Sequence, residues 1–263
     1  MPDVNSPAAK AAPPDGRPGT DRPSQSPPLA RRLLAEAVGT ALLVTVVVGS
    51  GIMAQKLSPN DTGVQLLENS TATVFGLGVL ILLFGPVSGA HFNPVVSAAD
   101  WFLGRSAGTG LGGSDVLAYT GAQTVGAILG AVLANAMYSL DPVQVSVHHR
   151  ASSGVLLGEV VATAGLVALI FALARTGRAP LSAAAVGAYI GSAYWFTSST
   201  SFANPAVTVG RIFSDTFAGI APASVPAFVA AQLVGAALGA TLIRALYPDI
   251  GEAADDVVVT HPY

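Results

Sequence analysis

The 263-residue chain contains no cysteine, and Asp, Glu, Lys and Arg together make up only 10% of it. Without cysteine it has no disulfide framework, no thiolate nucleophile and no cysteine metal site. Soluble domains carry roughly 25% charged residues, so the charge content is unusually low. The net charge is −3 and no basic cluster marks a nucleic-acid partner. These absences argue against a disulfide-rich, thiol-dependent or nucleic-acid-binding protein.

Long apolar segments dominate what the chain does contain, since 51% of its residues are hydrophobic. Six segments approach the roughly 20 residues that cross a bilayer. They cover residues 33–53, 67–85, 116–138, 155–173, 181–196 and 225–246. A soluble helical protein with a very apolar core is the alternative, but it would need polar outer helix faces that these segments lack. We therefore predict an all-α, multi-pass membrane protein.

The two ends of the chain differ from its middle. Residues 1–30 are rich in Pro, Ser, Gly and Ala and predict a disordered tail, not a signal peptide. Residues 31–247 form the predicted membrane domain, and 248–263 a second tail. With the N-terminus inside, nine Lys and Arg residues fall on the cytoplasmic side and two outside. This bias predicts a cell-membrane protein with both termini in the cytoplasm.

Two halves of the membrane domain, 31–140 and 153–247, resemble each other. Residues 35–41 match 158–164, and residues 122–131 match 231–240. Three spans per half force the halves into opposite orientations, which predicts an inverted repeat with its functional site near the bilayer midplane. Glycines four residues apart, at 126 and 130 and again at 235 and 239, predict close helix packing.

Each half contains one Asn-Pro step that opens a short apolar stretch, Asn93-Pro94 and Asn204-Pro205. Asparagine caps helix N-termini and proline suits the first helical position. About ten residues of helix rise roughly 15 Å, half of a bilayer core. The two stretches are therefore predicted to be re-entrant half-helices that meet at the midplane.

Such a pair of half-helices can line a pore that excludes ions. Each half-helix directs the positive end of its dipole toward the midplane. If the asparagine oxygens cap the helices, their NH₂ groups stay free to face the lumen. The positive centre then repels cations and protons, whereas neutral hydrogen-bonding solutes pass.

Glu36 and Glu159 are the acidic residues well inside the predicted spans, at equivalent places in the two halves. An ionisable group at that depth is a functional candidate, and one reading is a proton relay. The other, which the symmetric duplication favours, is a scaffold role in which each carboxylate accepts backbone N–H groups of the loop before a half-helix.

These motifs resemble those of the major intrinsic proteins, the aquaporin and aquaglyceroporin family. Residues 88–95 match the family's first motif, with Val95 where alanine is usual, and Asn204 to Ala206 match the second unaltered. The resemblance implies six tilted helices plus two half-helices in a lipid bilayer, assembled as a homotetramer with one pore per protomer. It implies neither an enzyme nor a bound cofactor or metal.

The resemblance also assigns a selectivity filter to Phe75, Ser192, Ser201 and Val207. Val207 stands where the family usually carries an arginine that narrows the pore, donates hydrogen bonds and repels cations. Its absence implies a wide, neutral and half-apolar filter. Arg211, one turn later, either anchors the half-helix, the reading we favour, or partly restores a charge.

In lacking this arginine, the chain resembles a bacterial subgroup of aquaglyceroporins that is associated with arsenic-resistance gene clusters. The leading hypothesis is a passive channel for small neutral solutes: glycerol-like polyols, metalloid acids such as arsenite, organoarsenicals and water. A water-selective channel and a coupled secondary transporter remain alternatives. A membrane enzyme is disfavoured because no His, Asp and Glu cluster has metal-ligand spacing, and His148-His149 reads as a solvated surface pair.

Overall fold

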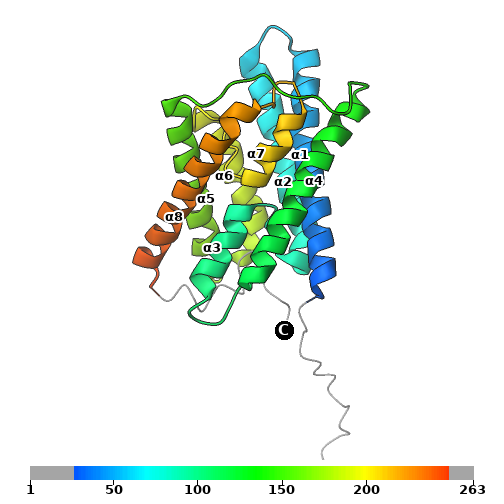
Figure 1. Ribbon diagram of the computed structural model, residues 1–263. Coiled ribbons are helices and arrows are strands. Elements are labelled where there is room, and N and C mark those ends of the chain that lie inside the picture. The colour runs from blue at the N-terminus through cyan, green and yellow to red at the C-terminus, as the bar shows by residue number, and fades with distance from the viewer. Residues whose placement is uncertain (1–26, 249–263) are drawn as a thin grey trace, which may run out of the picture.

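Helices are the regular elements of the computed structural model, which describes residues 27–248 (Figure 1). Five are long and apolar enough to cross a membrane. They are α1 (Leu29–Leu57), α2 (Thr62–Ser88), α4 (Gly113–Met137), α5 (Ser153–Arg175) and α8 (Val225–Leu246). The predicted all-α membrane class is confirmed. The predicted tails, 1–30 and 248–263, lie largely outside the described residues, and α1 already begins at Leu29.

The sixth predicted span, at 181–196, is α6 (Ser182–Phe196), a helix of 15 residues. At 1.5 Å per residue it measures about 22 Å, less than a bilayer core. A 3₁₀ turn, η1 (Ala179–Leu181), precedes it and lengthens the segment. Helix α6 packs against α2 and α5, so it completes the bundle in the expected place although it is shorter than its five partners.

Two half-helices fill the space between the long helices. Helix α3 (Pro94–Gly104) has 11 residues, and α7 (Pro205–Gly210) has six and continues into the 3₁₀ turn η2 (Arg211–Phe213). They run into the bundle from opposite ends, with α3 in the lower part and α7 in the upper part of Figure 1. A third 3₁₀ turn, η3 (Pro222–Ser224), leads into α8. The order α1-α2-α3-α4 is thus repeated, inverted, as α5-α6-α7-α8.

Glycines set the closest helix contacts, between α1 and α4 in the first half and between α5 and α8 in the second. A Cβ atom at any of four glycines would collide with a backbone carbonyl oxygen of the facing helix. Gly126 and Gly130 face Ala37 and Ala41, and Gly235 and Gly239 face Val160 and Ala164. The predicted packing role of these glycines is confirmed, at matching places in both halves.

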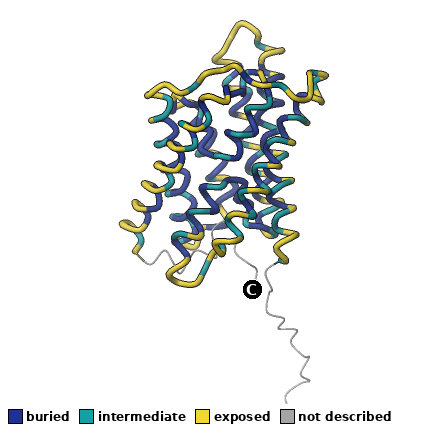
Figure 2. Tube along the Cα trace, viewed as in Figure 1, coloured by how far each residue is buried: buried dark blue, intermediate teal, exposed yellow. Residues whose placement is uncertain are grey.

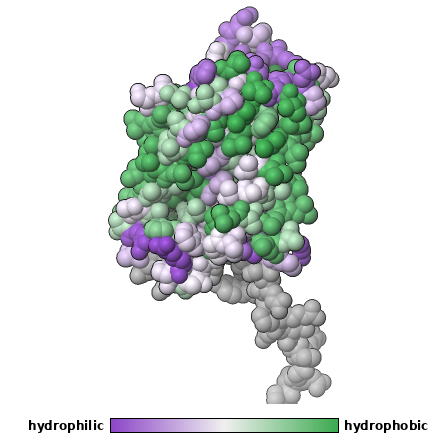
Figure 3. Space-filling model, in the orientation of Figure 1, coloured by the Kyte–Doolittle hydropathy of each residue, from purple (hydrophilic) through white to green (hydrophobic). Residues whose placement is uncertain are grey.

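The outer surface of the bundle is apolar along its middle. Leu83, Leu129 and Leu238 are 60%, 57% and 54% exposed, a cost in water but not in lipid. Figure 3 shows this belt between polar ends, and Figure 2 shows the most buried backbone in the centre of the bundle. The fold therefore presents a lipid-compatible wall and keeps its polar side chains for the interior.

Candidate functional site: a central pore

Both half-helices are capped by the asparagines that precede them. The Asn93 Oδ1 atom accepts the backbone N–H of Val95 at 3.1 Å. The Asn204 Oδ1 atom accepts the N–H groups of Ala206 at 3.0 Å and Val207 at 3.2 Å. A proline follows each cap at the first helical position, where its missing N–H costs nothing. The capping prediction is confirmed at both sites.

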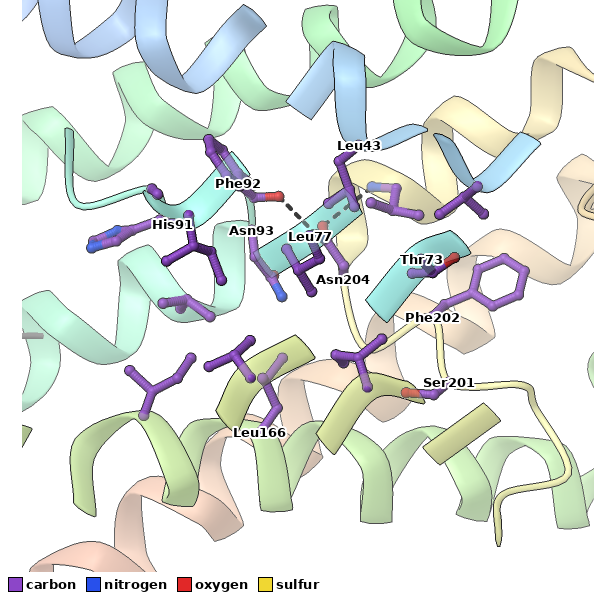
Figure 4. A pocket seen from close by; sticks show the side chains of 18 of the residues that line it. Leu43, Thr73, Leu77, His91, Phe92, Asn93, Leu166, Ser201, Phe202 and Asn204 are labelled. Carbon is purple, nitrogen blue, oxygen red and sulfur yellow. Dashed lines mark hydrogen bonds between the residues drawn. The ribbon is translucent and has the colours of Figure 1, made fainter. Parts of the chain in front are cut away.

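The asparagine NH₂ groups join the two halves at the centre. Asn93 Nδ2 donates to the Ala203 carbonyl at 2.8 Å, and Asn204 Nδ2 donates to the Phe92 carbonyl at 2.7 Å. Figure 4 shows the second of these bonds beside the cavity. The expectation that both NH₂ groups stay free is wrong in part, because each uses one N–H to bridge the halves. Each amide retains a second N–H, and both side chains line the cavity.

In the first half, a buried carboxylate holds the loop before α3. Glu36 accepts from the Ser88 hydroxyl at 2.6 Å and from the backbone N–H groups of His91 at 2.9 Å and Phe92 at 2.7 Å. The Gln123 side chain donates to it at 2.8 Å. Four donors satisfy this carboxylate, which is fully buried.

Glu159 has the same place in the second half. It accepts from the N–H groups of Phe202 and Ala203, each at 2.9 Å, and from the Gln232 side chain at 2.6 Å. Neither glutamate lines the cavity. These contacts support the backbone, as the repeat predicts. They also keep the carboxylates away from the cavity, whereas a proton relay would need carboxylates that face it.

The loops before the half-helices adopt an unusual backbone. Ala90 and Phe92 have φ values of 48°, and Ser201 and Ala203 have φ values of 49° and 47°. Left-handed conformations at such residues cost energy, so the glutamate bonds must hold them. In a trans peptide the carbonyl points opposite to the N–H. Because the loop N–H groups face the glutamates, the carbonyls of the preceding residues face the cavity and offer acceptors.

A cavity of about 70 Å³ runs between these loops and the long helices. One water-sized sphere needs roughly 10–15 Å³, so the space suits a short file of about five waters or one small solute. Its apolar wall is formed by four pairs of residues: Leu43 and Val47, Leu77 and Ile81, Leu166 and Ile170, and Val186 and Ile190. Opposite them lie polar side chains of the loops, including those of Asn93, Ser201 and Asn204 (Figure 4).

Comparison with known proteins agrees with this arrangement: the family model described as Major intrinsic protein matches residues 23–203. The chain belongs to the major intrinsic protein family. It is 48% identical over 216 residues to "Aquaglyceroporin AqpS" of Rhizobium meliloti (strain 1021), covering 82% of this chain and 90% of that relative. It is 34% identical over 261 residues to the "Glycerol uptake facilitator protein" of Pseudomonas aeruginosa, covering 84% and 90%.

The fold comparison points the same way. The X-ray structure of the aquaglyceroporin from Plasmodium falciparum matches with a TM-score of 0.59 at 18% identity, covering 86% of this chain and 100% of that one. At this identity the match establishes the fold alone. Membership of the major intrinsic protein family makes the protein a non-enzymatic, passive membrane channel for small solutes.

Of the filter residues that the family resemblance assigns, those in the second-half loop and on α7 line the cavity, and the one on α2 does not. Ser201 and Val207 line the cavity. Phe75 is 69% exposed on the outer face of α2, which corrects its assignment. The lining residues of α2 include Thr73 and Leu77. Two positions along a helix rotate a side chain by about 200°, so Phe75 points away from the cavity.

The assignment of Ser192 on α6 is wrong for the same reason. Ser192 is exposed and its hydroxyl donates to the Tyr189 carbonyl at 2.8 Å. Ile190 and Tyr194 line the cavity instead, and the Tyr194 hydroxyl lies 3.2 Å from that of Thr73. Regular four-residue spacing, 186-190-194 on α6 and 73-77-81 on α2, was the sequence signal that could have found them.

Arg211 overturns the expectation of an uncharged pore wall. Its side chain is 2% exposed and lines the cavity. Its Nε donates to the Ala218 carbonyl, and its guanidinium carbon lies 3.4 Å from the centre of the Phe202 ring. The predicted anchoring contact is therefore present, but the same residue also brings a cation to the cavity.

The other predicted site residues lie away from the lumen. Val95 is buried and does not line the cavity, so valine in place of alanine leaves the pore wall unchanged. Ala206 is fully buried in the first turn of α7. Across residues 27–248 no three His, Asp and Glu side chains gather as a metal site. His148 lies 3.8 Å from Asp215 on the surface.

Proposed function

We propose that the protein is an aquaglyceroporin-type channel for small neutral solutes that carry several oxygens on one side and carbon on the other. Glycerol, arsenous acid, methylated arsenicals and water are the expected solutes. The observation that carries the proposal is the mixed lining of the cavity, in which aliphatic side chains of the long helices lie together with the polar side chains of Asn93, Ser201 and Asn204 and with the hydroxyls of Thr73 and Tyr194. A polyol can exchange its hydration for loop donors and carbonyls while its carbon skeleton contacts the apolar wall.

The valine at position 207 supports a solute larger than water. An arginine there would occupy volume and donate hydrogen bonds, whereas Val207 leaves a short apolar wall beside Ser201. The two full-length relatives above are named for glycerol or its channels, which supports the same solute class. Asn93 and Asn204 supply donors at the centre, and Glu36 and Glu159 support the loops that carry them.

We further propose a homotetramer in the inner membrane with both termini in the cytoplasm. Support for the orientation comes from charge. Arg31 and Arg32 open α1, and Arg175 and Arg244 end α5 and α8 at that same end of the bundle. Such clustering favours the cytoplasmic side. The family resemblance supports the tetramer, which chemical cross-linking in membranes would test.

Solute flux into proteoliposomes tests the proposed function. Glycerol entry is followed by stopped-flow light scattering, and arsenic uptake is measured by mass spectrometry. We expect both rates to exceed those of empty liposomes by at least about tenfold, which corresponds to a permeation barrier lower by about 1.4 kcal/mol. Rates equal to empty vesicles for every solute would overturn the proposal.

A matched pair of variants on α2 ties the flux to this cavity. Leu77→Trp adds a bulky ring to the lining, whereas Phe75→Trp changes an outward residue on the same helix. We expect Leu77→Trp to lower glycerol flux strongly and Phe75→Trp to leave it unchanged. Equal fluxes for the two variants, both recovered as monodisperse protein, would place the pathway elsewhere.

The same measurements separate the alternatives. Rapid water flux with glycerol and arsenous acid excluded would favour a water-selective channel, with Thr73, Tyr194 and Val207 closing the gap. Accumulation of solute against its own gradient, driven by a pH difference, would favour a coupled transporter. The location of Glu36 and Glu159 away from the cavity supports the passive channel.

A further inference from the structure

Two arginines lie against the aromatic ring of Phe202, next to the proposed filter. The guanidinium carbon of Arg211 lies 3.4 Å from the ring centre, and that of Arg150 lies 5.5 Å from it. Both also donate hydrogen bonds to backbone carbonyls of residues 217–219, in the loop that follows η2. The two arginines therefore have similar surroundings, but only Arg211 lines the cavity.

Arg150 donates its side-chain hydrogen bonds to backbone carbonyls. Its Nε donates to the Gly219 carbonyl at 2.7 Å, and an Nη atom donates to the Phe217 carbonyl at 2.8 Å. The side chain does not line the cavity. Arg150 therefore acts as a brace for this loop, with its charge outside the cavity wall.

Arg211 binds the backbone with Nε alone, through the Ala218 carbonyl. Among residues 27–248, no group accepts a hydrogen bond from its two terminal nitrogens, and none forms an ion pair with them. Yet the side chain is 2% exposed and forms part of the cavity wall with Ser201 and Tyr194. A buried guanidinium whose terminal N–H groups have no protein partner is costly unless solvent or solute in the cavity accepts them.

The position of this guanidinium follows from the backbone. Arg211 begins the turn after α7, one helical turn beyond Val207. Its side chain folds back onto Phe202, the residue that follows Ser201 in the loop leading to Asn204. The cation therefore lies beside the loop that lines the proposed filter, although its own backbone is a turn further on.

We propose that Arg211 is the specificity-determining cation of this pore, replacing from one turn away the charge that is missing at Val207. Its terminal nitrogens donate to solute oxygens and its charge repels Na⁺, K⁺ and H₃O⁺. The valine leaves the opposite part of the wall apolar. The solute class that fits is a neutral molecule with at least two hydroxyls and an apolar face. This inference rests on the proposed channel function.

Three variants in proteoliposomes separate charge from hydrogen bonding and from packing. Arg211→Gln keeps donors but removes the charge, Arg211→Lys keeps the charge but removes the planar fork, and Arg150→Gln removes the neighbouring brace. Proton leak is followed with a trapped pH dye, sodium leak with a sodium dye, and glycerol flux by light scattering.

We expect Arg211→Gln to raise cation leak at least tenfold over wild type while glycerol still permeates. Arg211→Lys should stay cation-tight and lose severalfold in glycerol flux. Arg150→Gln should remain as cation-tight as wild type. A cation-tight Arg211→Gln channel that conducts glycerol, or an equal leak in Arg150→Gln, would overturn the inference.

If Arg211→Gln is not recovered folded, Arg211→Met takes its place, because it keeps the length of the side chain and its packing on Phe202 but removes the charge; a leaky Arg211→Met channel supports the charge role, and a cation-tight one that conducts glycerol overturns it. Failure of the proposed function looks different, because wild-type protein would then pass no neutral solute. Failure of this inference leaves wild-type glycerol flux intact.

Discussion

Three residues after each pore asparagine the chain carries a valine, Val96 in the first half and Val207 in the second, and both line the cavity. Seven residues after each asparagine the halves carry opposite charges. Asp100 accepts the backbone N–H of Leu111 at 2.7 Å and lies outside the cavity wall. Arg211 lies in the wall. The two halves thus repeat the backbone while placing a charge at the pore from one side only.

The polar scaffold, by contrast, is nearly identical in the two halves. The Gln123 side chain donates to the Ser97 hydroxyl at 3.1 Å, and the Gln232 side chain donates to that of Thr208 at 2.9 Å. Each glutamine also donates to the glutamate of its half. Because these bonds hold the backbone from behind, the pore-facing side chains are left free to differ. Changes behind the loops should therefore affect stability, and changes in front of them selectivity.

The largest expected effect is the loss of a scaffold carboxylate. Glu36→Ala would strip four buried donors of their acceptor, and Glu159→Ala three. Each unsatisfied buried group costs about 1–3 kcal/mol, so we expect about 3–5 kcal/mol or more of destabilisation. In detergent, both variants should begin to aggregate at a lower temperature than the wild type on heating, and Glu36→Ala at the lowest temperature.

Glu68→Ala is the control for these variants, since Glu68 is only half-buried and accepts a hydrogen bond from the Ser58 hydroxyl at 3.2 Å. A Glu159→Ala protein as heat-stable as Glu68→Ala would contradict the scaffold role. A Glu159→Ala protein that is markedly less stable than Glu36→Ala would break the proposed symmetry of the two loops.

The glycine contacts give the next largest effect. Gly126→Ala and Gly235→Ala would each drive a methyl group into a carbonyl of the facing helix, costing about 1–3 kcal/mol by overpacking. Gly121→Ala, on the same helix as Gly126, meets no atom within 4 Å and should be neutral or slightly stabilising. Thermal melts of the three variants check this, and a Gly126→Ala protein as stable as Gly121→Ala would refute the close approach.

The asparagine caps and the buried glutamates could be predicted from the sequence, because the caps depend on local contacts and the glutamates recur in both halves. The caps at Asn93 and Asn204 follow from residue type, and the duplicated glutamates follow from the inverted repeat. The assignment of Phe75 is wrong because the resemblance fixes a position along the chain but not the rotation of α2, which turns this side chain outward. The sequence favours an anchor role for Arg211 because the residue lies one turn past the assigned filter. Its return onto Phe202 depends on the Ala218 carbonyl, a contact that no helix period predicts.

The two cavity valines offer a smaller and more selective test. Val207→Arg should lower glycerol flux about tenfold, which corresponds to about 1.4 kcal/mol, and lower water flux less. The new side chain would share the filter with Arg211 and narrow it. Val96→Arg lies on the other half-helix and should reduce both fluxes in similar proportion. An unchanged glycerol-to-water ratio in Val207→Arg proteoliposomes would count against the filter assignment.

The smallest expected effect concerns the two asparagine caps. Asn204 accepts two backbone N–H groups and Asn93 one, so loss of the cap should cost about 1 kcal/mol at Asn204 and somewhat less at Asn93. The alanine variants lose the bridging hydrogen bond as well. Aspartate at either position keeps the cap acceptor but loses the NH₂ group that bridges the halves. Comparing each alanine variant with its aspartate partner in thermal melts therefore divides capping from bridging. If Asn204→Asp and Asn93→Asp were both as stable as wild type, the bridging bonds would contribute little, and the halves would be held together by the long helices alone.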